Sequence, residues 1–367
     1  MSRLPLEDIM VLDFSTLLAG PVAATFLGDF GAEVIKIEEP QNGEFTRSKM
    51  IYPDGRSPSW LLEGRNKKCI TLNLRTPDGQ TLAHKFAEKA DVIVMNFRPG
   101  QAEKWNLGAE DLHKTNPELI ILQVSAYGQT GPYRKKGGFD RTAQAFAGTT
   151  YVSGYPDRSP VRSGYALVDF MTAYLGAFGV MVALYNRDTH QCGGEVIDIS
   201  LVEAAFRASE AALPNYSLTG KIREREGNRN PMMVPADDFE TKDGRLLVLN
   251  AGTPALWKRL AQAMGKPELL EDPRFKEWPD RIKNQEQLYS IVEEWVKGLT
   301  AEEGMRILDA AKVPADYIRN IADLAEDPHL REREAVLEFD VPGTGKVLIP
   351  GIFPKMANAP GRIKHLG

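Results

Sequence analysis

Short runs of branched apolar residues alternate with helix-like segments through the first 125 residues, and this alternation constrains the fold more than any other feature of the chain. The runs are "IMVLDF" (9–14), "EVIKIE" (33–38), "CITLNL" (69–74), "DVIVMNF" (91–97) and "ELIILQVS" (118–125). Runs of this length and composition are typical of buried strands. Strands separated by helices pair in parallel, because the chain must cross back over the sheet before each new strand. The sequence therefore predicts an α/β fold in which helices cover both faces of a parallel sheet.

The pattern changes in the second half of the chain. The segment "TGKIREREGNRNP" (219–231) is charged and contains Gly and Pro, as linkers often do. It is followed by "DDFETKDGRLLVLNA" (237–251), which predicts a β-hairpin that turns at Asp243 and Gly244, and then by helical segments. A chain of 367 residues exceeds the size at which a single core stops growing, so we expect two domains.

The expected division gives the larger domain both ends of the chain. The large domain is predicted over residues 1–215, completed by 330–367, where strand-like residues return. A smaller α/β domain is predicted over residues 226–325. The expected linkers are at about 216–231 and 320–335.

Several classes of function are disfavoured by composition. A net charge of −5 gives no reason to expect a nucleic-acid partner, which leaves a basic footprint. Cys69 and Cys192 cannot form a disulfide framework and are expected to be reduced thiols. The five histidines form no cluster with metal-ligand spacing, so no metal is predicted. The N-terminus has acids where a signal peptide needs an apolar run, which predicts a cytoplasmic protein.

The longest apolar run, residues 165–185, contains a single formal charge, Asp169. The run is long enough to span a bilayer, but Arg162 and Arg187 flank it without the asymmetry that orients a membrane helix. We therefore predict a buried core helix. Asp169 has two interpretations: it caps this helix by accepting a backbone N–H, or it is a nucleophile that attacks an activated acyl carbon.

Basic residues concentrate between Trp60 and Arg141, where there are 13 lysines and arginines against 9 acids. Several lie at predicted strand ends or in loops, in "GRNKKC", "LRTPDG", "NFRPG" and "GPYRKKGGFDR". Open α/β sheets bind ligands at such edges. The residues could form a solvated surface, but four clusters favour an anion with several phosphates. A dinucleotide site is disfavoured because Gly-x-Gly-x-x-Gly is missing after the first strand, and the P-loop lysine motif and Gly-x-Ser-x-Gly are missing too.

The order of seven motifs resembles that of the class III CoA-transferases, which include formyl-CoA transferase and carnitine CoA-transferase. The motifs are "LAGPVAATFLGDFGAEVIKIE", "RNKKCITLNLRTPDG", "ADVIVMNFRPG", "NPELIILQVSAYGQTGPY", "GFDRTAQAFAG", "GYALVDFMTA" and "GEVIDISLVEAAF". The resemblance implies transfer of CoA from an acyl-CoA donor to a free carboxylic acid, with acyl-CoA as substrate and no prosthetic group. It also implies a Rossmann-like large domain and an interlocked, ring-like homodimer, or assembly with a related partner subunit.

The resemblance also assigns site residues. Asp169 stands at the family's aspartate nucleophile, which forms an aspartyl anhydride and then an aspartyl-CoA thioester. Of the implied CoA-binding residues, Phe139 and Asp140 are expected along the pantetheine, and Arg75, Arg98 and Lys104 at the phosphates. The full implied set is Leu18, Ala19, Leu72, Arg75, Asn96, Phe97, Arg98, Lys104, Lys136, Phe139 and Asp140.

Two alternatives remain open at this stage. An α-methylacyl-CoA racemase would need a histidine where Phe139 stands, because two bases must exchange the α-proton. A non-catalytic acyl-CoA-binding subunit would have no need of Asp169.

Overall fold

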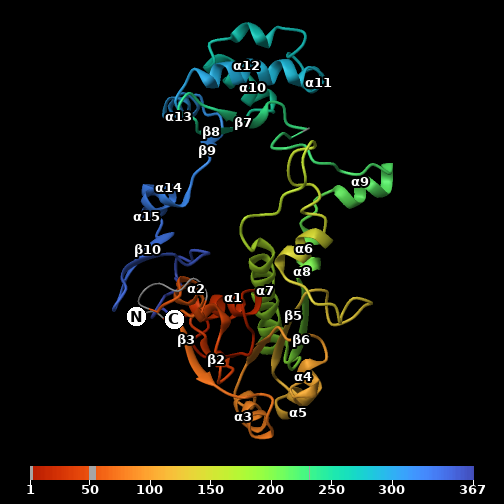
Figure 1. The fold of residues 1–367 in the computed structure, drawn as a ribbon, viewed down its shortest axis with the longest axis vertical. Helices are drawn as coiled ribbons and strands as arrows, with labels where there is room; N and C mark the ends of the chain where they lie inside the picture. The colour runs from red at the N-terminus through yellow and green to blue at the C-terminus, as the bar shows by residue number, and fades with distance from the viewer. Residues whose placement is uncertain (1–2, 49–54, 231) are drawn as a thin grey trace. The chain divides into compact units, whose positions relative to one another are not determined.

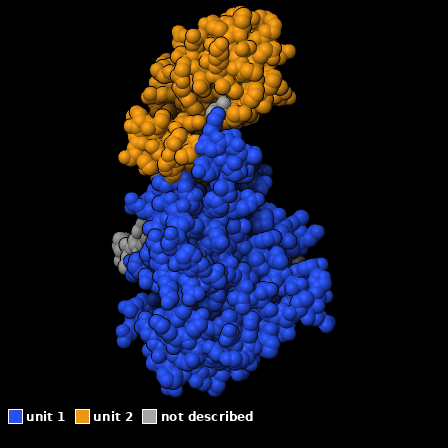
Figure 2. All heavy atoms as spheres, turned by 90° about the vertical axis from the view of Figure 1, so that its right-hand side faces the viewer, with its two compact units in different colours: residues 1–150, 162–221, 327–367 blue, residues 151–161, 222–326 orange. Residues whose placement is uncertain are grey.

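The chain forms two compact units, which are coloured separately in Figure 2. The structure, a computed structural model, describes residues 3–48, 55–230 and 232–367. Unit 1 consists of residues 1–150, 162–221 and 327–367. Unit 2 consists of residues 151–161 and 222–326.

Six parallel strands form the main sheet of unit 1, in the order β3-β2-β1-β4-β5-β6. Their bounds are β1 Met10–Asp13, β2 Glu33–Glu38, β3 Lys67–Thr71, β4 Val92–Met95, β5 Ile120–Ser125 and β6 Glu195–Ser200. Four of them confirm the strands expected from the apolar runs, β3 begins and ends earlier than the run at 69–74 that was expected to form it, and β6 is an additional strand. The strand order reverses between β1 and β4, so the connections leave a crevice outside the carboxyl ends of these two strands.

Helices cover both faces of this sheet, which gives unit 1 three layers (Figure 1). Successive strand residues point to opposite faces, so Val94 packs under one helical layer and Met95 under the other. The first layer contains α1 (Ala19–Asp29) and α7 (Leu167–His190), and the second contains α3 (Pro77–Ala87), α4 (Gln101–Lys104) and α5 (Ala109–Thr115). The other helices of this unit are η1 (Phe45–Ser48), α2 (Pro58–Glu63), α6 (Asp140–Phe146), α8 (Leu201–Arg207), α9 (Ala212–Thr219) and α15 (Pro328–Glu332).

The long apolar run forms α7, whose N-cap residue is Ala166. The N-cap interpretation of Asp169 is therefore wrong, because Asp169 is the third residue of the helix and lies in its first turn. By length and composition, α7 is the one helix among the described residues that could cross a membrane. One face packs on α1, β5 and β6, but the prediction of a buried helix is only partly right. Six large apolar residues of the helix are exposed: Leu167, Leu175, Phe178, Met181, Val182 and Tyr185.

Unit 2 is a three-stranded antiparallel sheet covered by helices. The predicted hairpin is confirmed: β7 (Ala236–Glu240) pairs with β8 (Leu246–Asn250), and Gly244 takes a φ of +76° in the turn between them. The third strand is β9 (Ala315–Tyr317), which pairs with β8. The helices of this unit are α10 (Pro254–Ala263), η2 (Pro267–Leu270), α11 (Trp278–Lys283), α12 (Gln285–Lys297), α13 (Ala301–Ala310) and α14 (Ile321–Glu326).

The C-terminal segment of unit 1 contains a separate hairpin and a docked tail. The strands β10 (Val336–Val341) and β11 (Gly345–Pro350) pair only with each other. The tail that follows packs against Asn66, near the start of β3. The Nδ2 group of Asn66 donates to the Arg362 carbonyl at 2.9 Å, and its Oδ1 accepts from the Lys364 N–H at 2.7 Å.

Candidate active site

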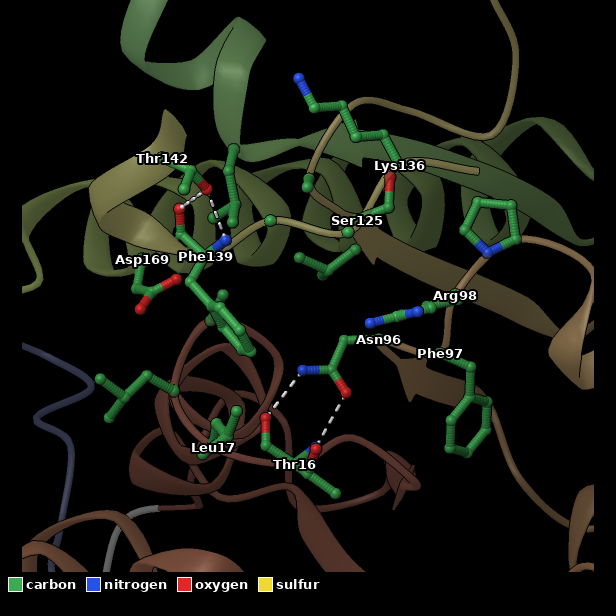
Figure 3. A pocket seen from close by; sticks show the side chains of 18 of the residues that line it. Thr16, Leu17, Asn96, Phe97, Arg98, Ser125, Lys136, Phe139, Thr142 and Asp169 are labelled. Atoms are coloured by element: carbon green, nitrogen blue, oxygen red, sulfur yellow. Dashed lines mark hydrogen bonds between the residues drawn. The ribbon is translucent and has the colours of Figure 1, made fainter. Parts of the chain in front are cut away.

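A pocket of about 530 Å³ opens at the carboxyl ends of β1, β4 and β5 (Figure 3). Parallel strands end at a common edge, so the loops that follow them converge there. The helix α7 leads from this edge back to the start of β6, so its first turn reaches the same pocket. The lining residues are Thr16, Leu17, Leu18, Ala19, Asn96, Phe97, Arg98, Pro99, Val124, Ser125, Ala126, Arg134, Lys136, Gly137, Gly138, Phe139, Thr142, Asp169 and Leu201.

Most of the residues implied by the family resemblance line this pocket. They are Leu18, Ala19, Asn96, Phe97, Arg98, Lys136, Phe139 and Asp169. The other four do not line it. Arg75 is exposed with its Nη1 atom 3.7 Å from Glu39, Lys104 is exposed on α4, Leu72 is half-buried against the core, and Asp140 is buried.

The loop after β1 rests on a group of buried charges. The Asp13 carboxylate lies 3.0 Å from Lys67 Nζ and 3.6 Å from Lys36 Nζ, and all three side chains are fully buried. Burial alone would raise the pKa of Asp13, but the charges of Lys36 and Lys67 and the Ser15 hydroxyl together hold that pKa below its ordinary value. The sheet edge under the pocket is therefore built on paired charges.

Glu44 connects these charges to the pocket. Its Oε2 atom forms an ion pair with Lys36 Nζ at 3.1 Å. The geometry of this contact is not that of a hydrogen bond. Its Oε1 atom accepts the Leu17 N–H at 2.9 Å. Leu17 has a φ of +69°, which a leucine rarely adopts, so this bond supports a strained backbone at the pocket wall.

Asn96, which follows β4, ties the loop after β1 to its neighbour. Its Nδ2 group donates to the Thr16 carbonyl at 2.7 Å, and its Oδ1 atom accepts the Thr16 N–H at 2.9 Å. Figure 3 shows this pair between Asp169 and Phe139 on one side and Arg98 on the other. The two loops therefore form one wall of the pocket.

Three cations line the pocket: Arg98, Arg134 and Lys136. The ammonium of Lys136 also lies 5.4 Å and 5.6 Å from the ring centres of Tyr127 and Tyr133, within the range of cation–π attraction. Arg134 was not predicted as a site residue, although it lies in the same basic cluster, "GPYRKKGGFDR", as Lys136.

Ser125 and Thr142 line the pocket as well, although neither was predicted from the sequence. Ser125 is the last residue of β5, and a polar residue at a strand end is the signal that could have identified it.

Asp169 is the one acid among the residues that line the pocket. It is half-buried in the first turn of α7, where the partial positive charge of a helix N-terminus stabilises a carboxylate. A carboxylate together with three cations suits an elongated anion whose reactive carbonyl reaches the acid. Among the residues that the structure describes, no group of His, Cys, Asp and Glu could hold a metal ion.

Known proteins resemble this chain over nearly its whole length. The family described as CoA-transferase family III matches residues 6–366. Succinyl-CoA–D-citramalate CoA-transferase of Chloroflexus aurantiacus is 40% identical, over 99% of this chain and 90% of that protein. The succinyl-CoA:mesaconate CoA-transferase of Haloarcula marismortui is 34% identical, over 92% and 86%. A CAIB/BAIF family protein from Brucella suis has a crystal structure that superposes with a TM-score of 0.87 at 28% identity, covering 100% of this chain and 96% of that one. The chain thus belongs to CoA-transferase family III, and it is an enzyme that transfers CoA from an acyl-CoA to a carboxylic acid.

Proposed function

We propose that this CoA-transferase uses Asp169 as its nucleophile and binds the acyl-CoA thioester in the pocket at the carboxyl ends of β1, β4 and β5. The observation that carries the proposal is that Asp169 is the one acid lining a pocket that also contains three cations. Carboxylates form covalent intermediates with activated acyl groups, and cations bind phosphates.

The proposed reaction has two halves. In the first, an Asp169 oxygen attacks the thioester carbonyl, the C–S bond breaks, and CoA thiolate leaves a mixed anhydride on Asp169. The thiolate then attacks the Asp169 carbonyl, which releases the donor acid as a carboxylate and leaves an aspartyl-CoA thioester. In the second half, the acceptor carboxylate attacks this thioester and forms a new anhydride and free thiolate. The thiolate attacks the acceptor's acyl carbon, which gives the product thioester and restores the Asp169 carboxylate.

The three pocket cations make this series of reaction steps efficient. If Arg98, Arg134 and Lys136 hold the CoA phosphates, the thiolate stays beside the anhydride instead of diffusing away. Holding a reactant in place in this way is worth about 7 kcal/mol or more of the barrier. Arg75, Lys104, Leu72 and Asp140 were also implied as CoA contacts. They lie outside the pocket lining, and for the first three a CoA contact remains a proposal.

We propose short dicarboxylic acids as the substrates. Relatives that are 40% identical are named for succinyl-CoA with D-citramalate or L-malate. A racemase receives no support from the pocket, because Phe139, which lines it, cannot transfer a proton.

We also propose that the protein works in the cytoplasm as a homodimer or with a related subunit, and that the two compact units are its large and small domains. The exposed apolar side chains of α7 include Leu175, Phe178, Val182 and Tyr185, which are spaced three or four residues apart and therefore share one helix face. A second copy of the chain would bury this face. Two relatives from Chloroflexus aurantiacus are named as alpha and beta subunits of one transferase.

Trapping the intermediate tests the nucleophile. The enzyme is incubated with succinyl-CoA and hydroxylamine, which should convert the acylated Asp169 to a hydroxamate that mass spectrometry of peptides detects. Asp169→Ala should abolish both the adduct and the transfer to L-malate. Asp188→Ala is a matched control, because this exposed acid lies on the same helix about 28 Å away. Turnover without an adduct at Asp169, or an active Asp169→Ala variant, would refute the assignment.

A further inference from the structure

The nucleophile's helix has no capping side chain of its own. The N-cap residue of α7 is Ala166, which offers no polar group to the first backbone N–H groups. An N-cap side chain ordinarily accepts the N–H of the second or third helical residue, which here are Val168 and Asp169. Some other group must satisfy these donors, because Val168 is buried.

Asp140 supplies the missing acceptor from a different helix. Its Oδ2 atom accepts the Val168 N–H at 2.7 Å and the Asp169 N–H at 3.3 Å. The two donors lie 28 and 29 residues further along the chain. Asp140 thus occupies the position of an N-cap side chain while belonging to the first turn of α6.

A second buried side chain holds Asp140 in place. The Nε2 group of Gln144, one turn along α6, donates to Asp140 Oδ1 at 2.6 Å. The Oε1 atom of Gln144 accepts the Ser163 N–H at 3.1 Å, in the segment that leads into α7. Asp140 is 7% exposed and Gln144 is 3% exposed, so the bond between them is shielded from water. Asp140 and Gln144 therefore fix the start of α7 from two directions.

We propose that Asp140 is a positioning residue for the transfer reaction, which acts as a distant cap that fixes the backbone of Asp169. The proposal rests on the proposed role of Asp169 as nucleophile. Phe139 and Thr142 line the pocket from the same helix end, so the cap also couples that wall to the nucleophile. In the first step an Asp169 oxygen must reach the thioester carbonyl carbon, and in the next two steps a thiolate and a carboxylate must reach the carbonyl carbon of Asp169. A displacement of about 1 Å at such a group costs on the order of 100-fold in rate.

Kinetics and hydrogen exchange together test this role. In Asp140→Ala we expect amide exchange to accelerate in a peptide covering residues 163–172, a readout that does not depend on activity. With succinyl-CoA and L-malate, kcat should fall on the order of 100-fold, whereas KM for succinyl-CoA should change less than about threefold. The split is expected because Arg98, Arg134 and Lys136 lie outside α6 and α7. Asp140→Asn keeps one acceptor oxygen and should give intermediate exchange and kcat.

The matched control removes a cap from a helix that carries no pocket residue. Thr300 accepts the Glu303 N–H at 3.2 Å at the start of α13, so Thr300→Ala loses a similar bond. It should lower stability without lowering kcat.

Three results would overturn the proposal: unchanged exchange at the start of α7 in Asp140→Ala, a kcat loss no greater than in Thr300→Ala, or wild-type exchange and kcat in Asp140→Asn. The Asn variant decides the question if Asp140→Ala does not fold. If Asp169→Ala is inactive while Asp140→Ala has wild-type kcat, only the present proposal fails. If Asp169→Ala is active, the assigned nucleophile is wrong.

Discussion

Replacing Glu44 by Gln should destabilise unit 1 strongly although it changes one atom. The ion pair with Lys36 spans 3.1 Å, and the two side chains are 0% and 1% exposed. At this distance and an effective dielectric constant of about 20, the attraction is about 5 kcal/mol. Gln keeps an acceptor for the Leu17 N–H, but it removes a negative charge that offsets the buried charge of the Lys36 ammonium. Removing one partner of such a pair costs about 3–5 kcal/mol, or roughly 6–20 °C in Tm.

Glu33→Gln provides a matched control, because Glu33 lies on β2, the strand that carries Lys36. Glu33 pairs with Lys68, but their side chains are 41% and 70% exposed, so the loss should stay within about 1 kcal/mol. Urea unfolding followed by hydrogen exchange in peptides from β1 and β2 measures the free energy of unit 1 separately from unit 2. If Glu44→Gln lowers the free energy of unfolding of unit 1 by no more than Glu33→Gln does, the buried charges do not stabilise the sheet edge.

Three further predictions concern binding, assembly and pH. Arg98→Ala should raise KM for succinyl-CoA about tenfold with little change in kcat, and the effect should shrink as salt rises; an unchanged KM would remove Arg98 from phosphate binding. Phe178→Asp should convert the proposed dimer to monomers in light scattering, because it places a charge on the exposed apolar face of α7; a stable dimer would contradict the proposed interface. Burial raises the pKa of Glu63, so the native state holds this proton more tightly than the unfolded chain does. Stability should therefore be greatest below the ordinary pKa of a glutamate and fall as pH rises through the raised value. Glu63→Gln should be more stable than the wild type at pH 7, with an advantage that vanishes at lower pH in urea unfolding; an equal advantage at both would refute this.

The strands of unit 1 could be predicted well because both faces of a parallel sheet are buried. Each strand then reads as a continuous apolar run, as in "DVIVMNF" around β4. Helix starts were less certain. The segment "TPDG" has the composition of a turn, but Thr76 caps α3 and the next three residues form the first turn of this helix. The strand β6 has half-buried and exposed residues in place of a buried run, and it was recognised only as part of a family motif.

The site could be anticipated only where a motif carried it. Asp169 and Arg98 line the pocket as the family resemblance implied. The position of Asp140 could not be derived from the sequence, because its partners are backbone N–H groups on another helix, which no residue pattern encodes. Arg75, in contrast, was implied as a site residue but does not line the pocket. It is a basic residue near a strand end, and its side chain lies beside Glu39.

The contact between the C-terminal tail and Asn66 affects the order in which parts of unit 1 fold during synthesis. The main sheet is complete once residue 200 has been made, yet the hydrogen bonds between Asn66 and the backbone of Arg362 and Lys364 can form only after the tail has been made. At about 5–20 residues per second, the ribosome needs roughly 8–32 s to cover that interval. During it, Asn66 lacks its partners in the tail, while residues 222–326, which belong to unit 2, are synthesised. Unit 1 therefore reaches its final set of hydrogen bonds only after unit 2 has been made.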